Sequence, residues 1–248
     1  MDLRETLKKG GRHPWEISRA DMLARVVGRI VKNARAGIAD IGAGDMYFDE
    51  RLLEILPAAK ITAVDICYDE KVKKPGIAIA RDIRELPDNS QDVVIMMDVL
   101  EHAADDSALL RAAARKLRPA SAAGEGLIVI TVPAFQCLWS PKDDFVGHHR
   151  RYTSRTLAAA VKRAGLRPVK MQYYYSGLVP ARIVEKLLKR RNDNDVGAWN
   201  WSEGSFVTRI VRFVLNADFM MNKILSKLGL SLFGLSIMVV AEKRSFSD

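Results

Sequence analysis

The chain has 248 residues and a formal net charge of +9. Its 48% hydrophobic and 28% charged residues are typical of a globular domain with a full core, which excludes a disordered chain. Cys67 and Cys137 show no metal-type spacing, so the sequence predicts no disulfide framework and a reducing, cytoplasmic location. Because the N-terminus lacks the apolar core of a signal peptide, we expect no export.

The positive charge is concentrated in the second half of the chain. From residue 147 onward there are 18 basic and 7 acidic residues, a balance of +11, so the first 146 residues carry about −2. Such a balance favours an anionic partner (nucleic acid, a phosphorylated substrate or a membrane surface), and a solvated basic face is the alternative. The longest uncharged stretch, residues 228–241, is too short and too glycine-broken to span a membrane.

A glycine turn follows the first predicted strand, residues 36–41. Gly42 and Gly44 lie one residue apart, before a segment that can begin a helix. Glycine lets a ligand approach the main chain closely, and the N–H groups that open a helix can bind its polar end. The dinucleotide fingerprint requires a third glycine where this chain has Tyr47, which disfavours a nicotinamide-dependent oxidoreductase.

Asp40, two residues before the first glycine, completes an Asp-x-Gly-x-Gly pattern. With it the sequence resembles the class I S-adenosylmethionine-dependent methyltransferases. The strand over residues 61–65 ends at Asp65, 21 residues beyond Gly44, where an acid can accept both ribose hydroxyls of an adenosine. The resemblance implies S-adenosyl-L-methionine as cofactor and S-adenosyl-L-homocysteine as product. The cofactor contacts that it implies are Asp40, Gly42, Ala43, Gly44, Asp65, Ile66, Asp82, Ile83, Asp98 and Val99.

The strand over residues 92–97 runs into Asp98-Val99-Leu100-Glu101-His102. A strand with this ending is similar to the ubiquinone- and menaquinone-biosynthesis branch of the family, where the following loop lines the methionine side of the cofactor. Oxygen and imidazole ligands at Asp98, Glu101 and His102 could share a divalent ion with His148 or His149. Because the first acid is Asp and metal-free relatives carry the same string, we expect no metal.

The segment after strand five, residues 133–152, holds two of the four histidines, aromatic residues and paired arginines. It leaves the sheet edge where ligands bind in open α/β folds. Imidazole titrates near neutrality and suits a general base, so the catalytic candidates are His148, His149 and His102. The substrate-binding candidates are Trp139, Arg150, Arg151 and Tyr152. Alternatively, Thr153 or Ser154 caps the next helix and the arginines hold the loop to acids of the body.

Alternating strands and helices predict an α/β, Rossmann-like, doubly wound sheet of seven strands, mostly parallel with an antiparallel last strand. Within one domain we expect an N-terminal helical cap (1–33), a cofactor-binding core (34–175), a helical insertion or lid (176–230) and the last strand (231–243). The insertion contains two basic amphipathic helices, over residues 180–191 and 206–228, joined by a polar loop, 192–203. These helices suit a cap, a lid for an apolar substrate, or a peripheral membrane contact.

The sequence therefore predicts transfer of a methyl group to an O, N or C nucleophile of a small lipophilic or anionic metabolite. An RNA methyltransferase that uses the basic C-terminal part is the alternative, with binding that falls steeply with salt. A nicotinamide-dependent oxidoreductase and a cofactor-binding protein that has lost catalysis are further alternatives. Neither the acceptor nor the oligomeric state can be read from the sequence.

Overall fold

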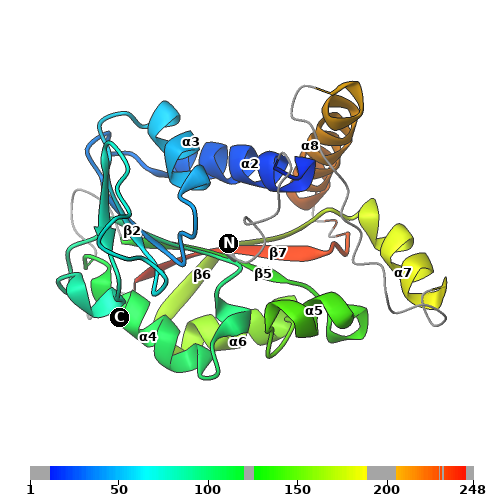
Figure 1. The fold of residues 1–248 in the computed structure, drawn as a ribbon. Coiled ribbons are helices and arrows are strands. Elements are labelled where there is room, and N and C mark those ends of the chain that lie inside the picture. The colour runs from blue at the N-terminus through cyan, green and yellow to red at the C-terminus, as the bar shows by residue number, and fades with distance from the viewer. Residues whose placement is uncertain (1–11, 120–125, 189–204, 229, 231, 244–248) are drawn as a thin grey trace.

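The computed structural model describes residues 12–119, 126–188, 205–228, 230 and 232–243. Seven strands form one sheet in the order β3-β2-β1-β4-β5-β7-β6 (Figure 1). They are β1 (Gly37–Ile41), β2 (Lys60–Val64), β3 (Ile77–Ala80), β4 (Val93–Met97), β5 (Leu127–Pro133), β6 (Leu166–Tyr174) and β7 (Ser236–Lys243). The pairs among β1 to β5 are parallel, and β7 runs antiparallel to both β5 and β6. The predicted seven-stranded, doubly wound sheet with an antiparallel last strand is confirmed.

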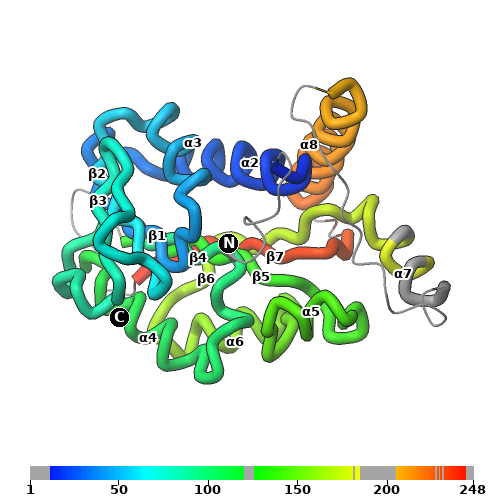
Figure 2. The backbone as a smooth tube through the Cα atoms, viewed as in Figure 1, coloured from blue at the N-terminus to red at the C-terminus, as the bar shows by residue number. Residues whose placement is uncertain are grey.

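Helices cover both faces of the sheet. In Figures 1 and 2, α2, α3 and α8 lie over one face, and α4, α5 and α6 lie over the other. The helices are α2 (Pro14–Ile30), α3 (Tyr47–Ile55), α4 (Asp106–Lys116), α5 (Pro141–Val146), α6 (Ser154–Arg163), α7 (Leu178–Leu188) and α8 (Phe206–Lys227). Pro14 at the first position of α2 and Thr153 at the N-cap of α6 match the sequence signals for helix starts.

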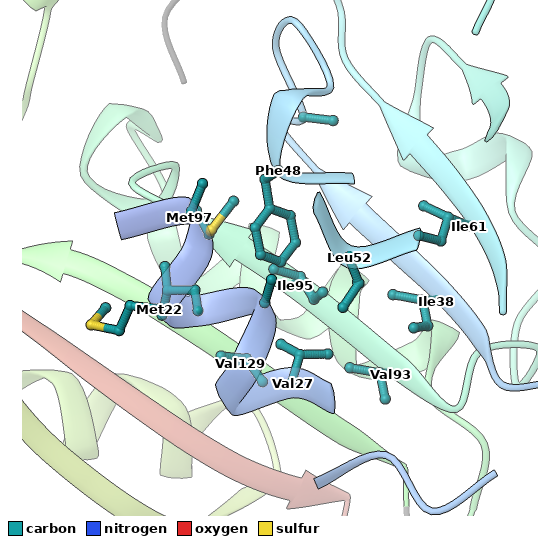
Figure 3. Close-up of a cluster of buried hydrophobic side chains, with 14 of the residues drawn as sticks. Met22, Val27, Ile38, Phe48, Leu52, Ile61, Val93, Ile95, Met97 and Val129 are labelled. Atoms are coloured by element: carbon teal, nitrogen blue, oxygen red, sulfur yellow. The ribbon is translucent and has the colours of Figure 1, made fainter. Parts of the chain in front are cut away.

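A close-packed apolar layer holds α2 and α3 on the sheet (Figure 3). Val27 of α2, Leu52 of α3, and Ile38 and Ile95 of the central strands have no measurable exposure. Burying a side chain of this size stabilises the fold by roughly 1.5–3 kcal/mol. This packing sets the first turn of α3, and with it the glycine turn, against the ends of β1 and β4.

Three elements differ from the sequence prediction. Residues 141–146, predicted as loop, form the short helix α5. The last strand, predicted over residues 231–243, begins at Ser236. Just before it, Gly234 lies so close to Tyr174 that a Cβ would be 2.2 Å from its carbonyl oxygen. The first insertion helix is α7, which begins at Leu178 and ends at Leu188. The predicted polar loop 192–203 lies outside the described residues, and no described helix is long and apolar enough to cross a membrane.

Candidate active site

The glycine turn joins β1 to α3 at the carboxyl edge of the sheet. Gly42 and Gly44 have φ of 73° and 58°, a left-handed backbone that favours glycine. A Cβ on Gly42 would lie 2.5 Å from Cγ2 of Val99, in the segment that follows β4. The turn, which includes the predicted cofactor contact Ala43, is thus fitted closely against the end of β4, which the predicted contact Asp98 follows.

This fit gives a stability prediction with a matched control. Alanine at Gly42 or at Gly147 (φ 78°) carries the cost of a left-handed residue, about 1–2 kcal/mol. Only at Gly42 must Val99 also move, because a Cβ on Gly147 meets nothing within 4 Å. In urea denaturation, Gly42→Ala should therefore lose more stability than Gly147→Ala, and Val99→Ala should recover part of the difference. Equal losses in the two variants would contradict the close fit.

Asp65 follows β2 and is tied to the glycine turn. Its Oδ2 accepts from the Gly44 N–H at 3.0 Å, and its Oδ1 accepts from the Cys67 N–H at 2.9 Å. The next side chain, Ile66, is 87% exposed, unusual for an isoleucine beside a buried strand. The carboxylate of Asp65 and the apolar side chain of Ile66 are therefore held at the rim of the turn, where sequence reasoning placed a nucleoside.

Asp82 and Ile83 lie beyond β3, in and beside the 3₁₀ helix η1 (Ile83–Glu85). Asp82 is the N-cap of this helix, and both of its carboxylate oxygens also accept hydrogen bonds from the Arg84 side chain. These bonds lower the pKa of Asp82 to about 2. The carboxylate is half-exposed, so it carries both a local structural role and a charge at the sheet edge.

Asp40 and Asp49 form a buried acidic pair beneath the glycine turn. All four carboxylate oxygens are buried without a hydrogen-bond partner among the described residues. Burial raises the pKa of Asp40 to about 7, and burial together with the neighbouring Asp40 raises the pKa of Asp49. Sequence reasoning found Asp40 from the motif, but nothing in the local pattern marked Asp49.

The raised pKa of Asp40 predicts a pH dependence of stability. Between its unfolded value of 3.8 and about 7, the folded state keeps a proton that the unfolded state has lost. The free energy of unfolding therefore falls as pH rises through this window, by up to about 1.4 kcal/mol per pH unit. In thermal melts, the stability of Asp40→Asn relative to that of the wild type should increase from pH 4 to pH 7. The pKa of Asp88 is lowered by Lys116, so this carboxyl changes stability only below about pH 4, and Asp88→Asn should keep a nearly constant offset from the wild type over the same range. Identical profiles for wild type and Asp40→Asn would contradict the assignment.

Helix α2 closes the site from above. Arg19 is buried, forms an ion pair with Asp98 and stacks over the Trp15 ring at 4.1 Å. Asp98 is held at φ 51° and accepts from Thr131 Oγ1 at 2.9 Å. The cavity between α2 and the glycine turn measures about 10 Å³, enough for about one water. A ligand that enters beside Gly42 must therefore displace side chains of α2.

A second polar cluster follows β4 and includes the 3₁₀ helix η2 (Leu100–His102). Glu101 is fully buried, neither of its carboxylate oxygens has a hydrogen-bond partner in the part of the chain that the structure describes, and burial raises its pKa to about 8. His148 places Nε2 3.9 Å from Glu101 Oε1 and Nδ1 2.8 Å from Asp143 Oδ1. His102 packs against His148 with ring centroids 4.7 Å apart. Asp143 holds the Nδ1 side of the His148 ring, and the other ring nitrogen, Nε2, faces the buried carboxyl of Glu101.

The ligand atoms of Glu101, His102 and His148 all lie within 4.8 Å of one another, so these three side chains could hold an ion. The metal ligands considered from the sequence were Asp98, Glu101 and His102, with His148 or His149, so two of the residues considered are absent from this group. Asp98 is paired with Arg19 instead, and His149 is exposed, with its backbone N–H donated to the Glu101 carbonyl at 2.8 Å.

The paired arginines hold the loop to acids, which is the second of the two arrangements that the sequence allowed. Arg151 donates to both carboxylate oxygens of Asp143, at 2.8 and 2.9 Å, and Arg150 lies 3.2 Å from Asp106. The remaining predicted substrate residues also have protein partners. Tyr152 is buried and donates to Asp106 at 3.0 Å, and Trp139 donates to Asp144 at 3.0 Å.

Asp143 is the residue that sequence reasoning missed here. It is 1% exposed and accepts from His148, Arg151 and Ser140. Its pKa is lowered, because the hydrogen bonds from His148 and Arg151 outweigh the effect of burial. An acid three residues after a serine and two after a proline is a helix-start signal that could have drawn attention to it.

Comparison with known proteins gives a domain match and structures with the same fold. Residues 39–123 match the family model described as a methyltransferase domain, and no curated protein matches the chain. Solved structures with the same fold include a SAM-dependent methyltransferase from Archaeoglobus fulgidus, 21% identical with a TM-score of 0.52, covering 90% of this chain and 94% of that one. Another is the Burkholderia thailandensis 1,6-didemethyltoxoflavin-N1-methyltransferase with bound S-adenosylhomocysteine (19%, TM-score 0.52, 93% and 81% covered). A third is the [4+2]-cyclase SpnF (17%, TM-score 0.57, 96% and 85% covered).

The match gives residues 39–123 as a methyltransferase domain, on the fold that the solved SAM-dependent methyltransferases share. The cyclase shows that the fold alone does not fix the reaction, so the assignment depends on the matched domain, which contains the glycine turn and Asp65. The nicotinamide-dependent alternative is set aside. None of these three structures is described as an enzyme of quinone biosynthesis, and that branch stays a prediction.

Proposed function

We propose that the enzyme methylates an O, N or C nucleophile of a small lipophilic or anionic metabolite, with the acceptor at the Glu101, His102 and His148 cluster. The observation that carries the proposal is the position of His148, held at Nδ1 by Asp143 with Nε2 facing the buried carboxyl. The cluster follows β4 at the same sheet edge as the glycine turn. An acceptor there would be adjacent to a cofactor seated on the turn.

The residues at the turn fit S-adenosylmethionine. Gly42 and Gly44 give the turn its left-handed backbone, Asp65 presents a carboxylate for the ribose hydroxyls, and Ile66 offers an exposed apolar side chain for adenine. When bound, S-adenosylmethionine supplies an electrophilic methyl group. The chain's own part is to orient the acceptor, exclude water under α2, and take the acceptor's proton at His148 Nε2.

Calorimetric titration tests the cofactor half of this proposal. The purified protein should bind S-adenosylmethionine and S-adenosylhomocysteine and leave NADH unbound. The acceptor half is tested by screening small-molecule acceptors with radiolabelled S-adenosylmethionine. Binding of NADH alone would overturn the proposal, and so would methyl incorporation confined to RNA.

We expect catalysis without a resident metal, although Glu101, His102 and His148 could ligate one. The hydrogen bond from His148 to Asp143 gives the cluster a protein-only role in proton transfer. Methyl transfer should therefore be unchanged after dialysis against EDTA, and metal analysis of the purified protein should find less than one equivalent. Activity that EDTA abolishes and a single divalent ion restores would contradict this expectation.

A further inference from the structure

The exposed apolar side chains are gathered in one part of the molecule. Eighteen large apolar residues are exposed among those that the structure describes, and fourteen of them lie between residues 183 and 233. Eight belong to α8, where Phe206 and Phe213 are 76% and 74% exposed. Phe206, Ile210, Phe213 and Ile224 recur at helical spacing along one side of α8, and an exposed apolar face of this kind marks an interaction surface, so a partner for it is expected.

The opposite face of α8 is already packed on the body of the protein. Leu215 and Phe219 are buried, and Asn216 is hydrogen-bonded to Ser18 of α2 at 3.0 Å. Arg212 donates to Asp21 of α2 at 2.8 Å. Helix α8 therefore has a fixed orientation beside α2, as Figures 1 and 2 show. Its exposed apolar side chains form a second apolar face, away from these contacts. A helix that is apolar on both faces requires a second apolar environment.

The charges of α8 indicate what that environment is. The helix contains four basic residues and a single acid, Asp218, a net charge of +3. The Asp218 carboxylate faces the turn between β6 and α7, where it accepts from Gly177 N–H at 2.6 Å and Ser176 N–H at 3.1 Å. Arg209 is exposed beside the apolar residues. Arg212 is paired with Asp21, so Arg209 is the exposed cation that the structure describes beside the outward apolar residues, and this combination of apolar side chains and positive charge complements anionic lipid.

We propose that α8 docks the enzyme on the surface of an anionic lipid bilayer. Phe206, Ile210 and Phe213 enter the boundary between headgroups and acyl chains, and Arg209 contacts lipid phosphate. The apolar residues supply most of the affinity, and the positive charge selects anionic over zwitterionic lipid.

Vesicle co-sedimentation of the full-length protein tests the proposal, with phosphatidylcholine vesicles and with mixed phosphatidylcholine–phosphatidylglycerol vesicles. The wild type should bind the mixed vesicles, and less strongly at high salt. The double variant Phe206→Ser/Phe213→Ser should bind at least tenfold more weakly. Arg209→Gln should bind the mixed vesicles about fivefold more weakly than the wild type does, and its binding to phosphatidylcholine vesicles should be unchanged. Val169→Ser, at an exposed apolar residue of β6, should bind as the wild type does.

Three outcomes would overturn the proposal, and none depends on catalysis because the assay reads binding alone. The first is no vesicle binding, or equal loss in the Val169→Ser control. The second is a dimer by light scattering, abolished in the double variant, in a protein that does not bind vesicles. The third is single-stranded RNA binding that Arg209→Gln weakens, again without vesicle binding.

Discussion

Replacing Asp65 by alanine should reduce the affinity for S-adenosylmethionine about 100-fold, because hydrogen bonds to a charged group contribute roughly 1.5–3 kcal/mol each. The carboxylate has two roles in this expectation. It is placed to accept the ribose hydroxyls, and its Oδ2 orders the glycine turn through the Gly44 N–H. Calorimetric titration of wild type and variant with S-adenosylhomocysteine, a stable ligand, measures the loss.

Asp69 provides the matched control, since its carboxylate also closes a local turn, accepting from Lys71 N–H at 2.8 Å. The control shares the local geometry of Asp65 but has no bond to the glycine turn. Asp69→Ala should keep the wild-type affinity. If a folded Asp65→Ala variant bound S-adenosylhomocysteine as tightly as the wild type does, the nucleoside would have to be bound elsewhere.

The fold and the glycine turn could be predicted from the sequence because their signals are local. A buried strand that ends in glycines, and another that ends in Asp65, are readable within a few residues, and parallel strands bring their carboxyl ends to one edge. The start of α5 was equally local. Ser140 and Asp143 form a capping box around Pro141, a signal that lies within four residues of the sequence.

The partners of the charged residues could not be predicted, because they are separated in sequence by many residues. Arg19 meets Asp98 only once α2 has folded over the sheet. Arg151 has the same charge whether it binds a substrate or Asp143, so only the structure distinguishes the two. The same limit applies to α8, whose pattern is amphipathic but whose outward apolar face becomes evident only when the packed face is known.

Replacing His148 by asparagine should lower kcat by about 10²- to 10⁴-fold, the range that a positioned general base contributes. The affinity for S-adenosylhomocysteine should stay unchanged, because His148 is in the acceptor cluster and not at the glycine turn. Steady-state kinetics with radiolabelled S-adenosylmethionine and an acceptor found by screening gives kcat, and calorimetry gives Kd. His149→Asn, at the exposed neighbouring imidazole, is the control and should keep most of the activity.

Asp143→Asn separates the positioning of His148 from its chemistry. This change removes the acceptor that fixes Nδ1 and leaves Arg151 without its carboxylate, which should cost about 3–5 kcal/mol of stability. In the folded fraction, kcat should fall, and the acidic limb of its pH profile should shift because imidazole loses its neighbouring charge. A purely structural role for Asp143 would lower stability and leave the pH profile in place.

If His148→Asn were as active as the wild type, another group would have to take the proton. The buried Glu101, whose pKa is raised to about 8, is the side chain placed to do so.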